Sequence, residues 1–132
     1  MYEVAATTTI RRPIGEVFDY IATIANWPVI DPMEAVENPP DHPTRQGETF
    51  VVLFKLGPFQ MTTDWTVAES VPPQRWVGDM VARKRIGILD SGASRMTYSL
   101  VGTADGTRVE LRYSWTPRNL ARFVELALPR GL

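Results

Sequence analysis

The chain has no cysteine and a single histidine among its 132 residues. The lack of cysteine excludes disulfides, thiolate zinc sites and cysteine nucleophiles, and it is compatible with a reducing compartment. No apolar run approaches the roughly 20 residues that a membrane-spanning helix needs. The first residues lack the basic start and apolar run of a secretory signal. We therefore expect a cytoplasmic protein without a membrane span.

The chain also lacks an excess of either positive or negative charge. The 14 basic and 15 acidic side chains give a formal net charge of −1. The longest basic groups are the Arg11–Arg12 pair and the cluster at 83–85, whereas nucleic-acid binding normally uses a broad basic face, so we expect none. No glycine-rich phosphate loop is present, and we expect no cofactor. The composition, 44% hydrophobic and 22% charged, suits one globular domain over residues 1–132.

The periodicity of apolar residues predicts an α+β protein. A helical stripe follows Pro13 and extends to Ala25, and a second one covers residues 117–128. The sequence 37–47 is rich in proline and is expected to be a loop, and Ala104-Asp105-Gly106 predicts a hairpin turn. Segregated helices and strands indicate α+β, with an antiparallel sheet that curls around a helix. Six strands are predicted, at 2–10, 48–56, 60–70, 75–85, 93–102 and 107–116.

The first helical stripe ends abruptly at Asn26-Trp27-Pro28. A residue that precedes proline is disfavoured in the α region, so the helix is expected to stop here. One interpretation is that Trp27 and the turn at 28–33 cap the open end of the sheet as the lid of a pocket. The alternative is an ordinary helix-ending turn in which Trp27 fills the core.

Several stretches together resemble the START/SRPBCC superfamily, the helix-grip fold shared with the birch-pollen allergens. The matching motifs are spread over nearly the whole chain and follow the family's order. Each one is a turn or a structural position of the fold, and none is a set of catalytic residues. The resemblance rests on TTIRRPIGEVFDY at 8–20, IATIANWPVIDP at 21–32, QGE at 46–48, VAESVPPQRW at 67–76 and DGTRV at 105–109.

The resemblance implies a six-stranded curled sheet wrapped around a C-terminal helix, with a helix and a short helix inserted after strand 1. It also implies a polyketide cyclase/dehydrase-like protein with a hydrophobic cup between the sheet and the helix. The family's C-terminal helix usually has about twenty residues or more, whereas residues 117–128 give roughly 18 Å of helix.

Strand alternation predicts which side chains line this cup. It places Asp64 outside, although a slip of one residue would bring it in. Two tyrosines and two tryptophans bring polar atoms to the inner face, which suits an apolar ligand that carries a few oxygens. The alternative is that these rings simply form the core. The candidate ligand-binding residues are Phe18, Trp27, Met61, Thr63, Trp65, Met96, Leu111, Trp115 and Phe123.

Three residues are candidates for catalysis. Tyr98 and Tyr113 would donate hydrogen bonds to a carbonyl or enolate oxygen of the substrate. His42 could act as a general base, although a lone histidine in a proline-rich loop is more often solvated. A metal site would need His42 with Asp41, Asp31 or Glu34, so we expect no metal.

Three functions remain open. The first is a cyclase or dehydratase that holds a flexible, oxygenated apolar substrate folded, so that proximity supplies much of the catalysis. The second is a non-catalytic binding protein or carrier for a lipid, an aromatic molecule or a pathway intermediate. The third is an interaction protein whose cup has collapsed. The stretch ETFVVLFKL is apolar on both faces and also makes a homodimer possible.

Overall fold

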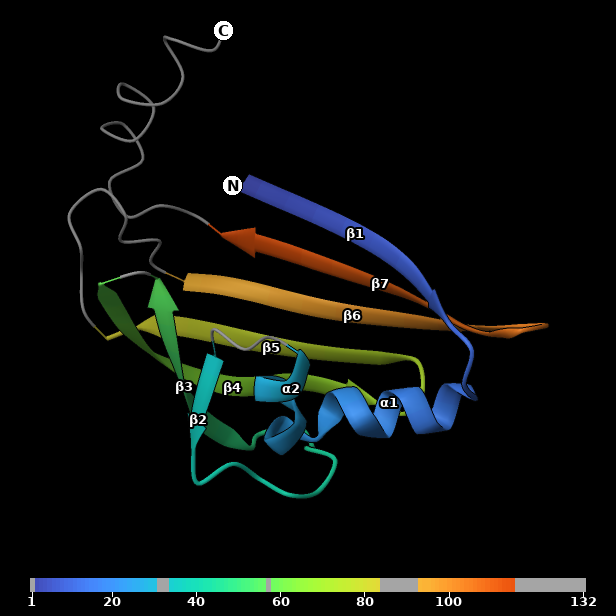
Figure 1. The fold of residues 1–132 in the computed structure, drawn as a ribbon, viewed down its shortest axis with the longest axis horizontal. Helices are drawn as coiled ribbons and strands as arrows, with labels where there is room; N and C mark the ends of the chain where they lie inside the picture. Colours follow the sequence, from blue (N-terminus) through green and yellow to red (C-terminus); the bar gives the residue numbers. More distant parts are fainter. Residues whose placement is uncertain (1, 31–33, 57, 84–92, 116–132) are drawn as a thin grey trace, which may run out of the picture.

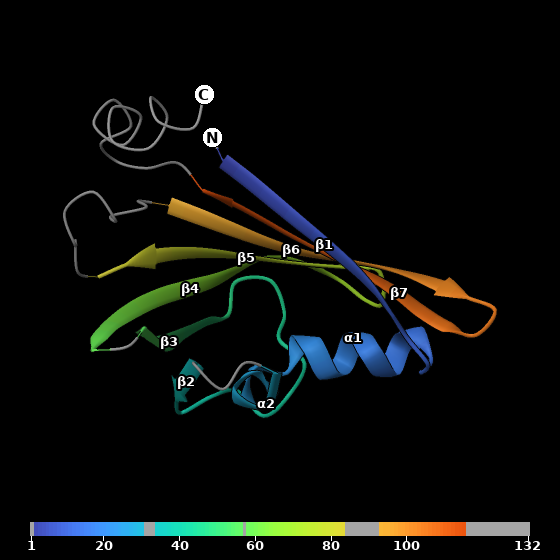
Figure 2. The same ribbon diagram turned by 45° about the horizontal axis from the view of Figure 1, so that its top comes forward.

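The computed structural model describes residues 2–30, 34–56, 58–83 and 93–115. Within them the chain forms one curved antiparallel sheet in the order β1-β7-β6-β5-β4-β3-β2, and the helices lie on one side of it (Figure 1, Figure 2). The strands are β1 (Tyr2–Ile10), β2 (Glu34–Glu37), β3 (Thr49–Leu56), β4 (Phe59–Val71), β5 (Arg75–Ala82), β6 (Ala93–Thr103) and β7 (Gly106–Trp115).

The predicted number of strands is wrong, because the sheet has seven and not six. The additional strand, β2, has only four residues, too few for a visible alternation of apolar and polar positions. It forms as an edge strand through its pairing with β3, where Val36 lies opposite Val52. The other strands and the β6–β7 hairpin are confirmed within a few residues. The predicted helix at 117–128 lies outside the described residues.

The helical connection between β1 and β2 breaks earlier than predicted. Helix α1 (Ile14–Ala22) ends where Thr23 adopts an extended conformation and its hydroxyl group donates to the carbonyl oxygen of Asp19 at 2.7 Å. A 3₁₀ turn (Ile24–Asn26) and the short helix α2 (Trp27–Ile30) follow. Trp27 is itself helical, at φ −60° and ψ −41°. Packing of its ring therefore outweighs the preference against helix before a proline.

Trp27 lies in the core and is only 2% exposed, as the core-filling alternative predicts. Its ring meets Phe50, Trp65 and Trp76 edge-on, with centroid distances of 5.2, 5.2 and 5.5 Å. Its indole N–H donates to the carbonyl oxygen of Ile21 at 2.9 Å. Each such ring pair contributes about 0.5–1.5 kcal/mol beyond its buried area. We call Trp27, Phe50, Trp65 and Trp76 the aromatic cluster.

Cross-strand pairing defines the concave face of the sheet, on which the helices pack. Leu111 of β7 lies opposite both Ala6 of β1 and Tyr98 of β6, and directly paired residues point to the same side. Asp64 points to the opposite, convex face, where Arg83 donates to both its oxygens at 2.8 and 2.7 Å. The predicted outward position of Asp64 is therefore confirmed.

The hairpin between β6 and β7 packs against the corner where β1 leads into α1. Gly106 has φ +155°, and a Cβ there would lie 2.1 Å from the carbonyl oxygen of Ile10. The next residue, Thr107, donates from its hydroxyl group to the carbonyl oxygen of Arg12 at 2.8 Å. These contacts fix the position at which α1 begins beneath the sheet.

Candidate functional site

The concave face is filled unevenly. The aromatic cluster and α2 occupy the part over β3, β4 and β5. A groove of about 630 Å³ remains between α1 and the strands β1, β7 and β6. It is lined by Ala6, Thr7, Thr8, Ile10, Arg12, Glu16, Val17, Tyr20, Ile21, Tyr98, Val109 and Leu111.

The floor of this groove comes from alternate residues of three adjacent strands. Ala6 and Thr8 of β1 lie opposite Leu111 and Val109 of β7, and Tyr98 of β6 completes the row. The facing wall is the apolar stripe of α1, with Val17 and Ile21 on the side toward the sheet. Apolar residues recur with the helical period in α1 and at every second position in the strands. Each wall therefore turns a row of apolar side chains toward the groove.

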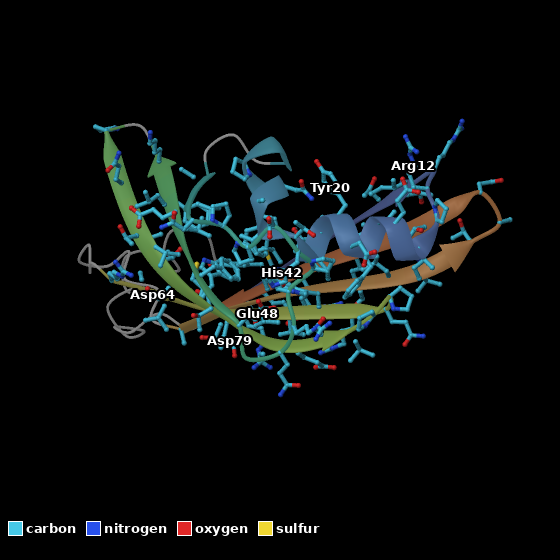
Figure 3. The ribbon with its side chains drawn as sticks, turned by 90° about the horizontal axis from the view of Figure 1, so that it is seen from below. Arg12, Tyr20, His42, Glu48, Asp64 and Asp79 are labelled. Carbon is cyan, nitrogen blue, oxygen red and sulfur yellow. The ribbon has the colours of Figure 1, made fainter. Side chains whose placement is uncertain are left out.

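The polar side chains of the lining come from α1, from its approach and from the strands. Arg12 lies where β1 leads into α1, and Tyr20 lies near the other end of the helix (Figure 3). Glu16 is in the first turn of α1, and Thr7 and Thr8 come from β1. Tyr98 is half-buried on the floor, and its ring lies 6.2 Å from that of Trp76. The groove thus presents an apolar channel with hydrogen-bonding groups at the arginine end and at Tyr98.

A family model described as "Polyketide cyclase / dehydrase and lipid transport" matches residues 1–132. The chain belongs to this family. The match confirms the resemblance to the START/SRPBCC superfamily that the turn and strand motifs indicated. The comparison with curated proteins finds no match.

Solved structures show the same fold. A protein from Arthrobacter aurescens has a TM-score of 0.71 at 11% identity, covering 98% of this chain and 78% of that one. Protein MLL2253 from Mesorhizobium loti has a TM-score of 0.68 at 14% identity, with coverages of 98% and 90%. Ara h 8.0201 has a TM-score of 0.64 at 9% identity, with coverages of 89% and 79%. At these identities the likeness concerns the fold alone.

Within this family fold, the predicted ligand-binding residues are divided between the groove and the core. Leu111 and the predicted catalytic Tyr98 line the groove. Phe18, Trp27, Thr63 and Trp65 are almost fully buried and do not line it. Thr63 is held by hydrogen bonds to the carbonyl oxygen of Val52 and from the indole N–H of Trp65, at 2.8 and 2.9 Å. Alternation alone does not distinguish an inward residue that meets a ligand from one that meets other side chains.

The remaining candidates lie elsewhere on the concave face or beyond the described residues. Met61, Met96 and Tyr113 are half-buried, and their pairings place them on the concave face. Trp115, the last residue of β7, lies opposite Tyr2 of β1 and Ser94 of β6 in the strand register. Phe123 lies outside the described residues. The ligand-binding and catalytic roles of all these residues stay predictions.

Sequence reasoning missed the contribution of β1 and α1. Ala6, Thr8 and Ile10 line the groove together with Glu16 and Tyr20, and none of them was a candidate. The alternation of β1 was visible, but its pairing with β7, more than a hundred residues later in the chain, was not. Glu16 and Tyr20 are polar residues on a helix, which sequence patterns assign to the solvent side.

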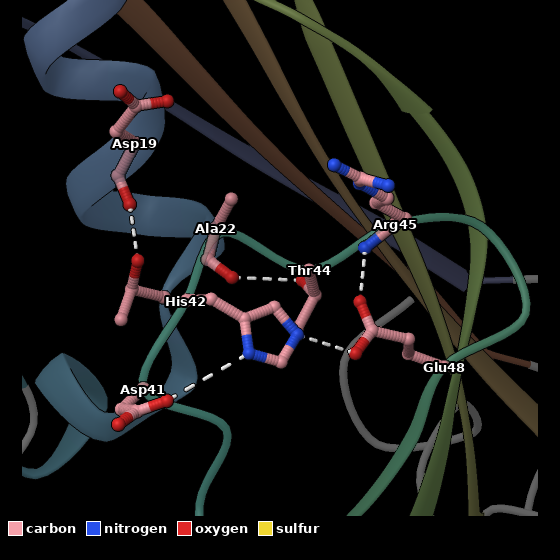
Figure 4. A network of polar contacts seen from close by, with 8 residues as sticks. Asp19, Ala22, Asp41, His42, Thr44, Arg45 and Glu48 are labelled. Carbon is pink, nitrogen blue, oxygen red and sulfur yellow. Dashed lines mark hydrogen bonds and ion pairs between the residues drawn. The ribbon is translucent and has the colours of Figure 1, made fainter.

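His42 lies outside the groove, in the loop between β2 and β3 (Figure 4). Its side chain is 53% exposed, with Nε2 at 2.6 Å from Glu48 and Nδ1 at 3.8 Å from Asp41. The backbone N–H of Arg45 also donates to Glu48, and this bond, followed by the contact with His42, lowers the pKa of Glu48 below its ordinary value of 4.5. A role of His42 as the base of a reaction in the groove stays a prediction.

Thr44 fastens the same loop to α1 and β5. Its hydroxyl group donates to the carbonyl oxygen of Ala22 at 2.7 Å and accepts from the indole N–H of Trp76 at 3.0 Å.

In the described part of the chain, no three acidic, histidine or cysteine side chains are grouped to hold a metal ion. No helix in that part has the length and hydrophobicity to cross a membrane.

Proposed function

We propose that the protein binds a largely apolar small molecule in the groove between α1 and strands β1, β7 and β6. The observation that supports this proposal is a space of about 630 Å³ with apolar side chains on both walls. A cavity of this size is in the range typical of small-molecule sites. Every 100 Å² of apolar surface that a ligand buries there contributes about 2.5 kcal/mol before the cost of association.

The aromatic cluster limits where such a ligand would lie. Trp27 contacts the rings of Phe50, Trp65 and Trp76, and Phe50 stacks on Trp65. All four side chains are buried against other protein atoms. We therefore expect a ligand to lie over β6, β7 and β1, in contact with the lining residues Leu111 and Ala6.

The experiment compares two alanines that are adjacent in β1. Ala6 lines the groove, whereas Ala5 lies opposite Arg112 on the convex face, and both are exposed. The neutral fluorophore 1-aminoanthracene serves as the apolar probe. We expect Ala6→Phe to fill the groove and weaken probe binding at least ten-fold, since the added ring occupies the volume the probe needs. Ala5→Phe should bind the probe like the unchanged protein.

Two results would contradict the proposal. One is that the unchanged protein does not bind the probe at all. The other is that Ala5→Phe and Ala6→Phe weaken binding equally, because the probe then contacts some other part of the molecule.

Catalysis of the cyclase or dehydratase type is the second candidate, and a specific feature favours it. Tyr98 and Glu16 both line the groove, so that a hydroxyl donor and a carboxylate face the same apolar space. These are the groups needed to polarise a carbonyl and to accept a proton. Native mass spectrometry would identify a co-purifying small molecule, and its conversion on incubation would distinguish an enzyme from a carrier.

We also propose that residues 117–128 form the family's C-terminal helix and cover the concave face. Support comes from apolar residues of β1 that the described part of the chain leaves exposed on this face, with Val4 56% and Ile10 36% exposed. The predicted stripe of Leu120, Phe123 and Val124 would complete the hydrophobic enclosure of a ligand.

A further inference from the structure

Among the residues that the structure describes, only Arg12 and Glu16 bring charge to the groove, and both lie at one end of it. We propose that it takes an anionic amphiphile, such as a molecule with an apolar body and a terminal carboxylate, and that Arg12 binds the anionic end. This inference rests on the proposed function, because it assigns a ligand class and an orientation to the same groove.

The backbone of Arg12 is anchored, whereas its side chain is available. The N–H of Arg12 donates to Ile10, and its carbonyl oxygen accepts from Thr107, at 2.9 and 2.8 Å. Among the described residues, its guanidinium group contacts only Glu16, through one N–O distance of 3.4 Å. The side chain of Arg12 is 68% exposed. The backbone of Arg12 is therefore held at the groove, whereas most N–H groups of its guanidinium make no hydrogen bond to the described residues.

Three arginines of the convex face have a different environment. Arg83 and Arg95 each donate two hydrogen bonds to one aspartate, and Arg112 contacts both Glu3 and Glu110. The contacts with Asp64, Asp79 and Glu3 join neighbouring strands, and all of these contacts occupy the fork of the guanidinium group. An exposed ion pair such as that between Arg12 and Glu16 contributes only about 0.2–1 kcal/mol. A ligand carboxylate that pairs with both arms of the fork would displace it.

The structure also indicates why Arg12, and not Glu16, is the binding charge. Glu16 lies in the first turn of α1, where a carboxylate stabilises the helix, so it already has a structural role. The apolar walls extend from this end along β1 toward Ala6, a distance of about 13 Å for four residues of strand. An extended apolar chain with its anionic end at Arg12 fits this layout.

The test measures displacement of 1-aminoanthracene by three ten-carbon probes: decanoate, 1-decanol and decylammonium. We expect the unchanged protein to prefer decanoate to decylammonium. Arg12→Gln should weaken decanoate about five-fold, the scale of one partly exposed charged hydrogen bond, and should leave 1-decanol unchanged. Glu16→Gln should strengthen decanoate, because it removes the competing carboxylate. Arg11→Gln is the matched control, since it removes the same charge from a residue that does not line the groove.

Each outcome decides the proposal. Loss of decanoate affinity in Arg12→Gln but not in Arg11→Gln, reduced by added salt, supports it. Equal loss in both variants, or a preference for decylammonium, overturns the assignment to Arg12 while the proposed function stands. If 1-aminoanthracene binds but none of the ten-carbon probes displaces it, the ligand class is wrong. If 1-aminoanthracene itself does not bind, the proposed function fails as well.

Discussion

At the scale of single residues, Gly78 shows how closely the aromatic cluster is fitted to the sheet. It lies on the concave face of β5, between Val67 of β4 and Met96 of β6. A Cβ at this position would lie 2.6 Å from the ring of Trp76 and 3.0 Å from that of Trp65. The missing side chain is what lets both rings lie over the strand.

Gly78→Ala should therefore destabilise the protein. The added methyl group forces two buried rings apart, and such overpacking costs about 1–3 kcal/mol. Gly102→Ala is the matched control, because no atom lies within 4 Å of a Cβ at that position. Urea unfolding of both variants measures the difference. Equal stability of the two alanine variants would show that the cluster relaxes without cost.

At the scale of elements, the loop between β2 and β3 holds α1 in place beneath the sheet. Thr44 joins the end of α1 to Trp76, and Glu48 closes the loop through Arg45 and His42. The proline-rich sequence 37–47 indicated only a loop. Its tertiary contacts connect the end of α1, which forms one wall of the groove, to β5.

The carboxylate of Glu48 should make the stability of this loop depend on pH. Its pKa in the folded protein is below 4.5, chiefly because the backbone N–H of Arg45 donates to it. The stabilisation is therefore fully present above the unfolded-state pKa and is lost as the pH falls through the folded-state value. We expect Glu48→Gln to lower the free energy of unfolding at neutral pH, and the difference from the unchanged protein to vanish in acid. Denaturant unfolding at a series of pH values measures it. A difference that increases toward acid would contradict the assignment.

At the scale of the whole molecule, the concave face has a packed part and an open part. Rings and α2 fill the space over β3, β4 and β5, whereas α1 and the strands β6, β7 and β1 enclose the groove. The packed part supplies a hydrophobic core, so the open part is free to hold a ligand. The exposed apolar residues of β1 mark where the face remains uncovered by the described residues.

The absence of cysteine allows a direct test of the proposed C-terminal helix. We expect the thiol of Ala6→Cys to react with a maleimide several-fold more slowly than that of Ala5→Cys, because only Ala6 would lie under residues 117–128. Adding Val124→Asp should remove this protection by weakening the contact of the helix with the sheet. Equal rates for the two thiols would show that no helix covers this part of the sheet.

The sequence alone determined the fold class and the family, because these depend on local patterns. Alternation in β4, β6 and β7, the stripe of α1 and the turn at Asp105-Gly106 are properties of neighbouring residues. It also determined which side chains of these strands face the helices. The short strand β2 was not predictable, because four residues carry no period and form a strand only through pairing.

Only the tertiary structure decided which inward residues form the core and which line a cavity. Trp65 and Leu111 have the same alternation, but the ring of Trp27 covers the first, whereas the second faces open space. It likewise brought Ala6 to the groove, since β1 pairs with β7, the last strand along the chain. The physical reason is that packing depends on contacts between segments distant in the chain, and a local period carries no information about them.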